Sequence, residues 1–107
     1  MRIDRYILDE HGEPKPEPDL MKWARWFETA ERHVGNTTLP GGIRISTIFL
    51  DLDHSFSFTE DAEPVLWETI VFKPDRESMS MQRYRSRAAA IAGHIEAVAI
   101  YRRLSDN

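Results

Sequence analysis

The sequence contains no cysteine, which excludes disulfide bonds, thiolate metal sites and a cysteine nucleophile. It also lacks any run of about 18 apolar residues, the length that a membrane-spanning helix requires, so we expect no membrane contact. No glycine-rich loop is present, which excludes a P-loop or a dinucleotide-binding turn. No secretory leader pattern precedes Ile3, and we therefore expect a cytoplasmic protein.

Positive charge is the scarcer sign, with 14 Lys and Arg against 18 Asp and Glu and a net charge of -4. Non-specific nucleic-acid binding usually requires a basic surface, so we expect none. The charges are also unevenly spread. Residues 1–63 carry 7 basic and 13 acidic groups, whereas residues 64–107 carry 7 basic and 5 acidic groups. The acidic part could cover a basic protein surface, and the basic part could hold an anion.

The length and the 41% hydrophobic composition suit a single domain spanning residues 1–107. Apolar periodicity and turn signals predict the order β-α-β-β-β-β-α. The predicted strands cover residues 2–8, 36–39, 43–50, 65–72 and 79–84, and Pro40-Gly41-Gly42 indicates a hairpin turn between the second and the third. Apolar residues on both faces of 43–50 and 65–72 suggest that these two strands are central. One helix of about fourteen residues is capped by Asp19 and ends at Gly35 as its C-cap, and the other is capped by Ser86 and runs to about Leu104. We predict an α+β fold: a single domain with an antiparallel sheet of four to five strands and two helices packed on one face.

Apolar stripes predict which face of each helix is buried. The stripe of the first helix comprises Leu20, Trp23, Phe27 and Ala30. Trp26 falls off this stripe, so it either packs against a sheet edge, which we favour, or serves as a binding anchor. The predicted stripe of the last helix comprises Ala88, Ile91, Ala92, Ile95, Val98 and Ala99, with His94 at its border.

Polar side chains around the two most apolar strands form the first candidate site. Asp51, Asp53 and His54 follow one strand, and Glu68 lies within the next. With His94, these residues offer oxygen and nitrogen ligands suited to Mg²⁺ or Mn²⁺. The alternative is structural: a buried ion pair and carboxylates that cap the polar loop from Ser55 to Glu63. In either case Glu68 needs a partner, an Arg, a His or a metal, because burying a lone charge is costly.

Arg83, Arg85 and Arg87 form the second candidate site, just before the last predicted helix. Helix N–H groups and guanidinium groups together can bind a phosphate or carboxylate. The alternative is that these arginines pair with the acidic front half of the chain.

Several short runs, in this order, resemble a family of small uncharacterised proteins of bacteriophages and prophages. They are WARWFE (Trp23 to Glu28), STIFLDLDHSF (Ser46 to Phe56), LWETIVF (Leu66 to Phe72), Arg83-Tyr84 and Gly93-His94. The usual family pattern reads STVFLGLDH and FETMVF. Asp51 therefore stands where glycine is common, and Trp67 where phenylalanine is common. The resemblance spans Tyr6 to His94.

The resemblance implies a phage accessory gene, but no established activity. Asp53, His54, Glu68 and His94 match the family's polar positions, whereas Asp51 does not and is the first to drop from a shared site. We favour a protein that acts by binding in the host cytoplasm, inhibiting a host defence system by capturing a host protein or a nucleotide signal, with Arg83, Arg85, Arg87 and Trp26 as contact residues. This hypothesis requires no cofactor. One alternative is a metal-dependent hydrolase using Asp53, His54, Glu68 and His94; another is a structural phage component.

Overall fold

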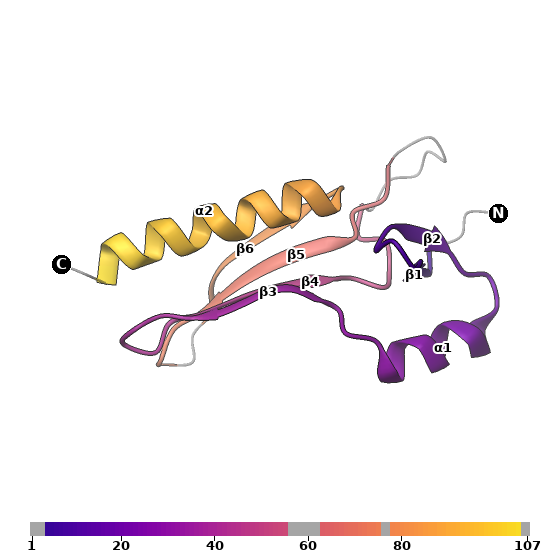
Figure 1. The fold of residues 1–107 in the computed structure, drawn as a ribbon, viewed down its shortest axis with the longest axis horizontal. Coiled ribbons are helices and arrows are strands. Elements are labelled where there is room, and N and C mark those ends of the chain that lie inside the picture. Colours follow the sequence, from indigo (N-terminus) through magenta and orange to yellow (C-terminus); the bar gives the residue numbers. More distant parts are fainter. Residues whose placement is uncertain (1–3, 56–62, 76–77, 106–107) are drawn as a thin grey trace.

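A four-stranded antiparallel sheet forms the centre of the structure, a computed structural model that describes residues 4–55, 63–75 and 78–105 (Figure 1). The strands are β3 (His33–Thr38), β4 (Arg44–Phe49), β5 (Trp67–Phe72) and β6 (Ser78–Tyr84), in the order β3-β4-β5-β6. β4 and β5 are therefore the central strands, as their apolar residues on both faces predict. The α+β class and the antiparallel sheet are confirmed.

A second, two-stranded sheet lies at one end of the molecule. It pairs β1 (Tyr6–Leu8) with β2 (Pro14–Pro16), and α1 (Leu20–Thr29) follows it (Figure 1). The Tyr6 N–H donates to the Asp51 carbonyl over 2.9 Å, which ties β1 to the chain just beyond β4. β2 was not predicted, because its two prolines leave few backbone donors for pairing.

Local signals explain where the elements begin and turn. The Asp19 carboxylate accepts the N–H groups of Met21 and Lys22 at 2.9 and 3.2 Å, so it caps α1 as predicted. Gly41 and Gly42 both have a φ of 94°, which the hairpin between β3 and β4 requires. The predicted polar loop from Ser55 to Glu63 lies mostly outside the described residues.

α2 (Arg87–Ser105) runs along one face of the four-stranded sheet (Figure 1). Ser86 Oγ accepts the Ala89 N–H over 3.0 Å and caps the helix as predicted. The side of α2 that meets the sheet includes Ala90, His94, Ala97, Val98 and Tyr101. The predicted stripe on α2 is therefore partly wrong: His94 is buried, whereas Ile95 is 64% exposed. None of the helices in the described ranges is long and apolar enough to cross a membrane.

The position of α1 differs from the expected arrangement of both helices on one sheet face. α1 contacts β1 and lies beyond the end of the sheet, on the side away from α2 (Figure 1). The helix stops at Thr29, well before Gly35, which is part of β3. The prediction that Phe27 is a core residue is wrong, because Phe27 is 40% exposed. Trp23 is half-buried and stacks on Phe27 with ring centroids 5.9 Å apart.

Two apolar clusters join these parts. One contains Phe49, Leu66, Trp67, Tyr84 and Ala90, and the other contains Leu39, Ile45 and Val71 under the second half of α2. Trp26 packs its ring edge against Phe49 at a centroid distance of 5.7 Å, which fixes α1 to the first cluster. The opposite face of the sheet has no helix or strand over it in the described part of the chain.

Candidate functional site

A buried chain of polar side chains crosses the contact between α2 and the sheet. Antiparallel pairing of β4 with β5 sets Thr47 directly opposite Thr69, and their hydroxyl oxygens are 2.5 Å apart. His94 reaches down from α2, with Nδ1 2.8 Å from Thr47 Oγ1 and Nε2 2.9 Å from Thr37 Oγ1. The Tyr84 hydroxyl donates to Thr69 Oγ1 over 3.1 Å. The chain thus links all four strands of the sheet, β3 to β6, to the helix.

One direction of donation satisfies every member of this chain. Tyr84 donates to Thr69, Thr69 to Thr47, and Thr47 to Nδ1 of His94, whose Nε2–H then donates to Thr37. This assignment needs a neutral imidazole protonated on Nε2. Burial lowers the pKa of His94 from its ordinary value, which favours the neutral form. The histidine is therefore a satisfied core residue, in which both ring nitrogens serve to hold α2 on the sheet.

Two glycines, Gly35 beside His94 and Gly93 beside Tyr84, leave space for the side chains of the polar chain. A Cβ at Gly93 would lie within 2.2 Å of the Tyr84 hydroxyl, so only a glycine lets the tyrosine pass beneath α2. Tyr84 is buried, and its hydroxyl is thereby brought to Thr69. Because His94 and Tyr84 are both buried within the fold, this constellation has the character of an internal support and not of a substrate site.

Asp53 and His54 lie in the segment after β4, away from His94. Asp53 Oδ1 accepts the N–H groups of Ser55 and Val65 at 2.8 and 2.9 Å. His54 Nδ1 is 2.7 Å from the Leu52 carbonyl oxygen. Asp53 therefore joins two backbone segments that are ten residues apart in the sequence, which is the loop-capping alternative.

Glu68 has the partner that its apolar strand predicts. Register places Glu68 opposite Arg83 on β6, and Arg83 Nε donates to Glu68 Oε2 over 2.9 Å. The carboxylate side chain is 8% exposed and the guanidinium 35%. This ion pair lies on the sheet face opposite α2, because side chains alternate along β5 and Thr69 points toward the helix. The expectation of an Arg, His or metal partner for Glu68 is confirmed.

The four proposed metal ligands are therefore not brought together. Asp53 and His54 lie beyond the end of the sheet, Glu68 projects from the sheet face opposite α2, and His94, on α2, lies against the other face. In residues 4–55, 63–75 and 78–105, no group of three or more His, Cys, Asp or Glu side chains could hold a metal ion. The metal-site hypothesis for these residues is wrong in its geometry, because it required all four side chains to meet at one point.

Asp51 has a structural role through its backbone carbonyl group. Its carbonyl oxygen accepts the N–H of Tyr6 at 2.9 Å and the indole N–H of Trp23 at 3.2 Å. Burial raises the pKa of the Asp51 carboxyl group above its ordinary value, while the positive charge of Arg32 acts in the opposite direction. Asp51 thus joins β1 and α1 to the end of the sheet.

The three arginines of the second candidate site point to different partners. Arg83 pairs with Glu68, and Arg85 donates to the Glu63 carbonyl oxygen. The Arg87 side chain lies beside Gly12, in the connection between β1 and β2. A single anion held by all three would need at least Arg83 to leave its present contact. Trp26 is half-buried against Phe49, which agrees with the packing role and not with a binding anchor.

Two parts of the protein surface expose apolar side chains, and the sequence patterns predicted neither of them as exposed. The first is α1, whose residues Leu20, Met21 and Phe27 are 56%, 60% and 40% exposed. The second is the sheet face opposite α2, which carries Ile48, Ile70, Phe72 and Met81 between polar side chains. The strand register could have indicated the second surface, because alternate residues of central strands must line a second face.

Comparisons of the chain with protein-family models, with curated proteins and with solved structures found no match. The resemblance to phage proteins therefore stays a prediction.

Proposed function

We propose that this protein is a phage-type accessory protein that binds a host protein in the host cytoplasm and thereby inhibits a host defence system, without catalysis. The contact is made by α1, which enters an apolar groove whose rim is basic. The observation that carries the proposal is the exposure of Leu20, Met21 and Phe27 on a helix that stands at one end of the molecule (Figure 1).

The spacing on α1 suits recognition by a groove. Leu20, Trp23, Ala24 and Phe27 stand at i, i+3, i+4 and i+7, which is the pattern of helices that bind through one apolar face. Trp23 anchors the base of this face, because its indole N–H donates to the Asp51 carbonyl. Arg32 lies over the Phe27 ring at 4.4 Å from its centroid, which fixes one end of the face. The helix is thus held in place before it meets a partner, which reduces the entropy cost of binding.

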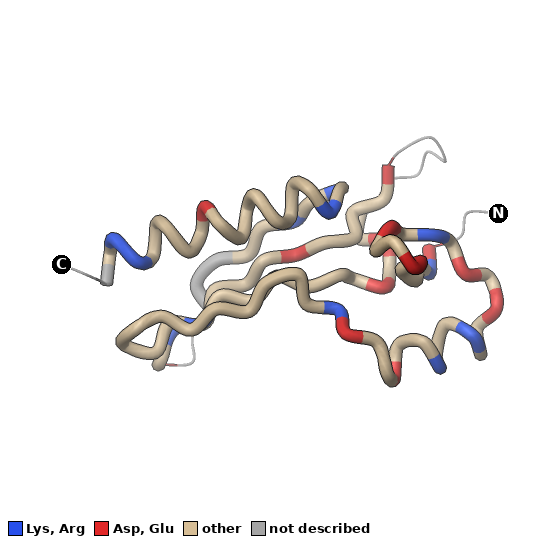
Figure 2. Tube along the Cα trace, in the orientation of Figure 1, with Lys and Arg blue, Asp and Glu red and all other residues tan. Residues whose placement is uncertain are grey.

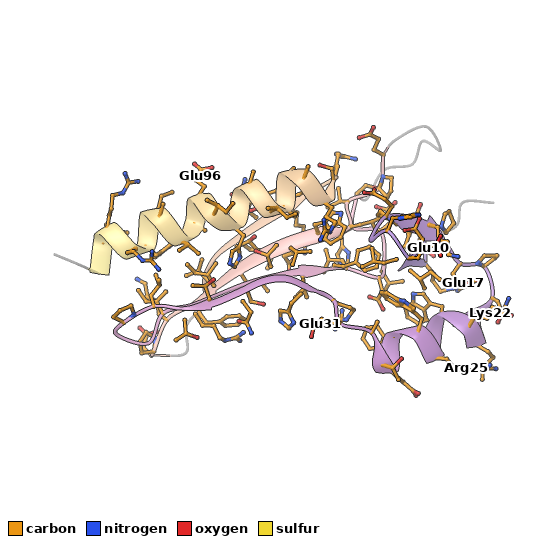
Figure 3. The ribbon with its side chains drawn as sticks, viewed as in Figure 1. Glu10, Glu17, Lys22, Arg25, Glu31 and Glu96 are labelled. Atoms are coloured by element: carbon orange, nitrogen blue, oxygen red, sulfur yellow. The ribbon has the colours of Figure 1, made fainter. Side chains whose placement is uncertain are left out.

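Charge supports a basic partner. Residues 9–31, which include β2 and α1, carry seven carboxylates and three basic side chains. Figure 2 shows the acidic residues of this segment along the backbone at the α1 end of the molecule. In Figure 3, Glu10 and Glu17 lie beside the two-stranded sheet, with Glu31 near the end of α1. An acidic border around an apolar face steers a protein with a basic rim toward the contact.

The other hypotheses have less support. Capture of a nucleotide would use Arg83, Arg85 and Arg87, whose side chains have separate contacts. The hydrolase alternative depended on four side chains that lie apart. A structural phage component is supported by no feature of the described residues beyond the exposed apolar surface itself.

The test is a pull-down from a bacterial host lysate with three forms of the full chain: wild type, Leu20→Ser/Phe27→Ser, and Ile95→Ser as the matched control. Ile95 is also an exposed apolar residue, but it lies on α2. We expect one host protein to be retained by wild type and by the control and lost with the double variant. Titration of that purified protein should show binding at least about tenfold weaker for the double variant.

Nucleotide mass spectrometry on the bound fraction supplies the second measurement. Equal retention of the host protein by all three forms would reject α1 as the contact. A nucleotide could instead copurify with wild type and be lost with Arg85→Ala and Arg87→Ala. That result would reject host-protein binding as the function and support nucleotide binding.

A further inference from the structure

The face of the four-stranded sheet opposite α2 presents apolar side chains that no other described element covers. Strand alternation places Ile48 of β4, Ile70 and Phe72 of β5, and Met81 of β6 on this face. Register sets Ile70 directly beside Met81, which is 58% exposed. These apolar side chains alternate on the face with polar ones, Ser46 and the Glu68–Arg83 ion pair. We call Ile48, Ile70, Phe72 and Met81 the open-face patch.

The charges around the open-face patch have opposite signs at opposite ends. Arg44 begins β4 at the hairpin end, where its guanidinium lies 4.3 Å from the centroid of Phe72. Glu31 lies at the α1 end, below the sheet in Figure 3, beside His33. His33 and Thr38 bound β3, and Thr38 pairs with Arg44, so the two charged ends are roughly 17 Å apart along the strands.

Both charges are available to a partner. The Glu31 side chain is 78% exposed. The N–H of His33 donates to its carboxylate and lowers the pKa of Glu31, so the group stays ionised near neutral pH. Arg44 makes one long hydrogen bond, 3.5 Å to Asn36 Oδ1 on the same face. Glu68 and Arg83 lie level with His33, at the α1 end of the face, and neutralise each other.

This arrangement is self-complementary. A twofold axis that lies between two such faces, parallel to the sheet and perpendicular to the strands, brings the Arg44 end of one copy over the Glu31 end of the other. The same axis sets the two open-face patches against each other. We infer that the open face of the sheet binds a second copy of this chain, as a face-to-face dimer closed by two Arg44–Glu31 contacts. This contact is separate from the α1 contact proposed above, because it uses different residues.

The chemistry of the face favours a second copy over a nucleic acid. Proteins that bind single strands on a sheet stack bases on several exposed aromatic rings within a basic surface. Among the described side chains of the open face, Phe72 is the only Phe, Tyr or Trp, and Arg44 already lies over its ring. The chain as a whole carries a net charge of -4.

The size of the face sets the expected affinity. Four strands of about six residues give a face of roughly 20 Å by 19 Å. A standard interface buries about 800 Å² on each partner, and this face alone offers less. We therefore expect a weak dimer, with a Kd on the order of micromolar.

Sedimentation equilibrium of the full chain around micromolar concentrations tests the inference, with Met81→Lys against the control Ile95→Lys. Met81 is too exposed for the change to unfold the sheet, and circular dichroism verifies this. We expect wild type and Ile95→Lys to dimerise, and Met81→Lys to weaken the dimer at least about tenfold. A wild type that stays monomeric, or a dimer lost in Ile95→Lys and kept in Met81→Lys, overturns the proposal.

A charge exchange tests the twofold arrangement itself. Arg44→Glu and Glu31→Lys should each weaken the dimer, because each creates like charges across the interface. The double variant Arg44→Glu/Glu31→Lys should restore it to within about threefold of wild type, since the opposite charges then meet again. Failure of the double variant to recover overturns the Arg44–Glu31 contact. Binding of a single-stranded oligonucleotide by the wild type, abolished by Met81→Lys, would assign the face to nucleic acid instead.

Discussion

The imidazole ring of His94 occupies the space in which a side chain at position 35 would begin. A Cβ built on Gly35 would lie 2.6 Å from both Cδ2 and Nε2 of His94. Gly35 is part of β3, and its absent side chain lets the ring pass between α2 and the sheet to reach Thr37 and Thr47. The glycine and the histidine therefore form one packing unit, although they are 59 positions apart in the sequence.

Gly35→Ala should destabilise the fold by about 1–3 kcal/mol, because the added methyl group must displace the ring or the strand. The free energy of unfolding in urea measures the cost. Asn36→Ala is the matched control on the next residue of β3, whose side chain is exposed on the opposite face. A loss in the control as large as that in Gly35→Ala would show that β3 is sensitive throughout and that the close approach is not the cause.

Thr47→Val should also cost about 1–3 kcal/mol, since it keeps the shape of the side chain but leaves Nδ1 of His94 without its hydroxyl partner. Thr38→Val on the edge strand is the control, because Thr38 is exposed. Thermal or urea unfolding of both variants gives the comparison. Equal stabilities of Thr47→Val and wild type would mean that the hydrogen-bonded chain does not support α2.

The sequence predicted the four strands of the main sheet, the hairpin and both helix N-caps better than it predicted how the helices face the sheet. The turn at Gly41 and Gly42 and the caps Asp19 and Ser86 depend on local geometry, which neighbouring residues determine. α2 carries apolar residues on nearly every side, so apolarity alone could not locate the buried face.

Hydrogen bonds determine which face of α2 meets the sheet. The partners in these bonds are far from α2 in the sequence, so the helix sequence alone does not reveal the buried face. His94 is drawn to the sheet by Thr37 and Thr47, and this leaves Ile95 in solvent. The partner of Glu68 could be predicted as a class, because a buried carboxylate requires one, but its identity depends on the register of β5 with β6. The metal hypothesis failed for the same reason: strand alternation alone separates Glu68 from His94.

Stability should fall in mild acid through His94. Its pKa in the folded state is below the ordinary value of 6.5, so below that pH the unfolded chain binds a proton that the folded protein does not. The free energy of unfolding then decreases as the pH falls from about 7 to about 5, by at most about 1.4 kcal/mol per pH unit for this one proton. His94→Gln should show a flatter pH dependence than wild type, and His11→Gln, in an exposed loop, should not. A slope unchanged in His94→Gln would contradict the burial of a neutral ring.

Arg83→Met should destabilise the fold by roughly 1–3 kcal/mol, because Glu68 would keep a buried carboxylate without its guanidinium partner. The value is below that of a fully buried pair, since Arg83 is partly exposed and solvent screens it. The double variant Glu68→Gln/Arg83→Met should recover part of the loss. A double-mutant cycle in urea measures the coupling between the two residues, and a coupling near zero would mean that the ion pair contributes nothing beyond its separate side chains.

Divalent metals should leave the melting temperature unchanged. A metal that binds the folded state raises that temperature by mass action, and the effect is large when the metal is in excess of its Kd. The proposed ligands Asp53, His54, Glu68 and His94 lie at three separate places, where Asp53 and His94 are engaged with Val65 and Thr47 respectively. Thermal melts with Mg²⁺, Mn²⁺ and Zn²⁺, each against a chelator control, measure any shift. A large shift that disappears in His54→Ala would reject the binding-only function and restore the hydrolase alternative, because it would require His54 to be a ligand in a conformation that brings these residues together.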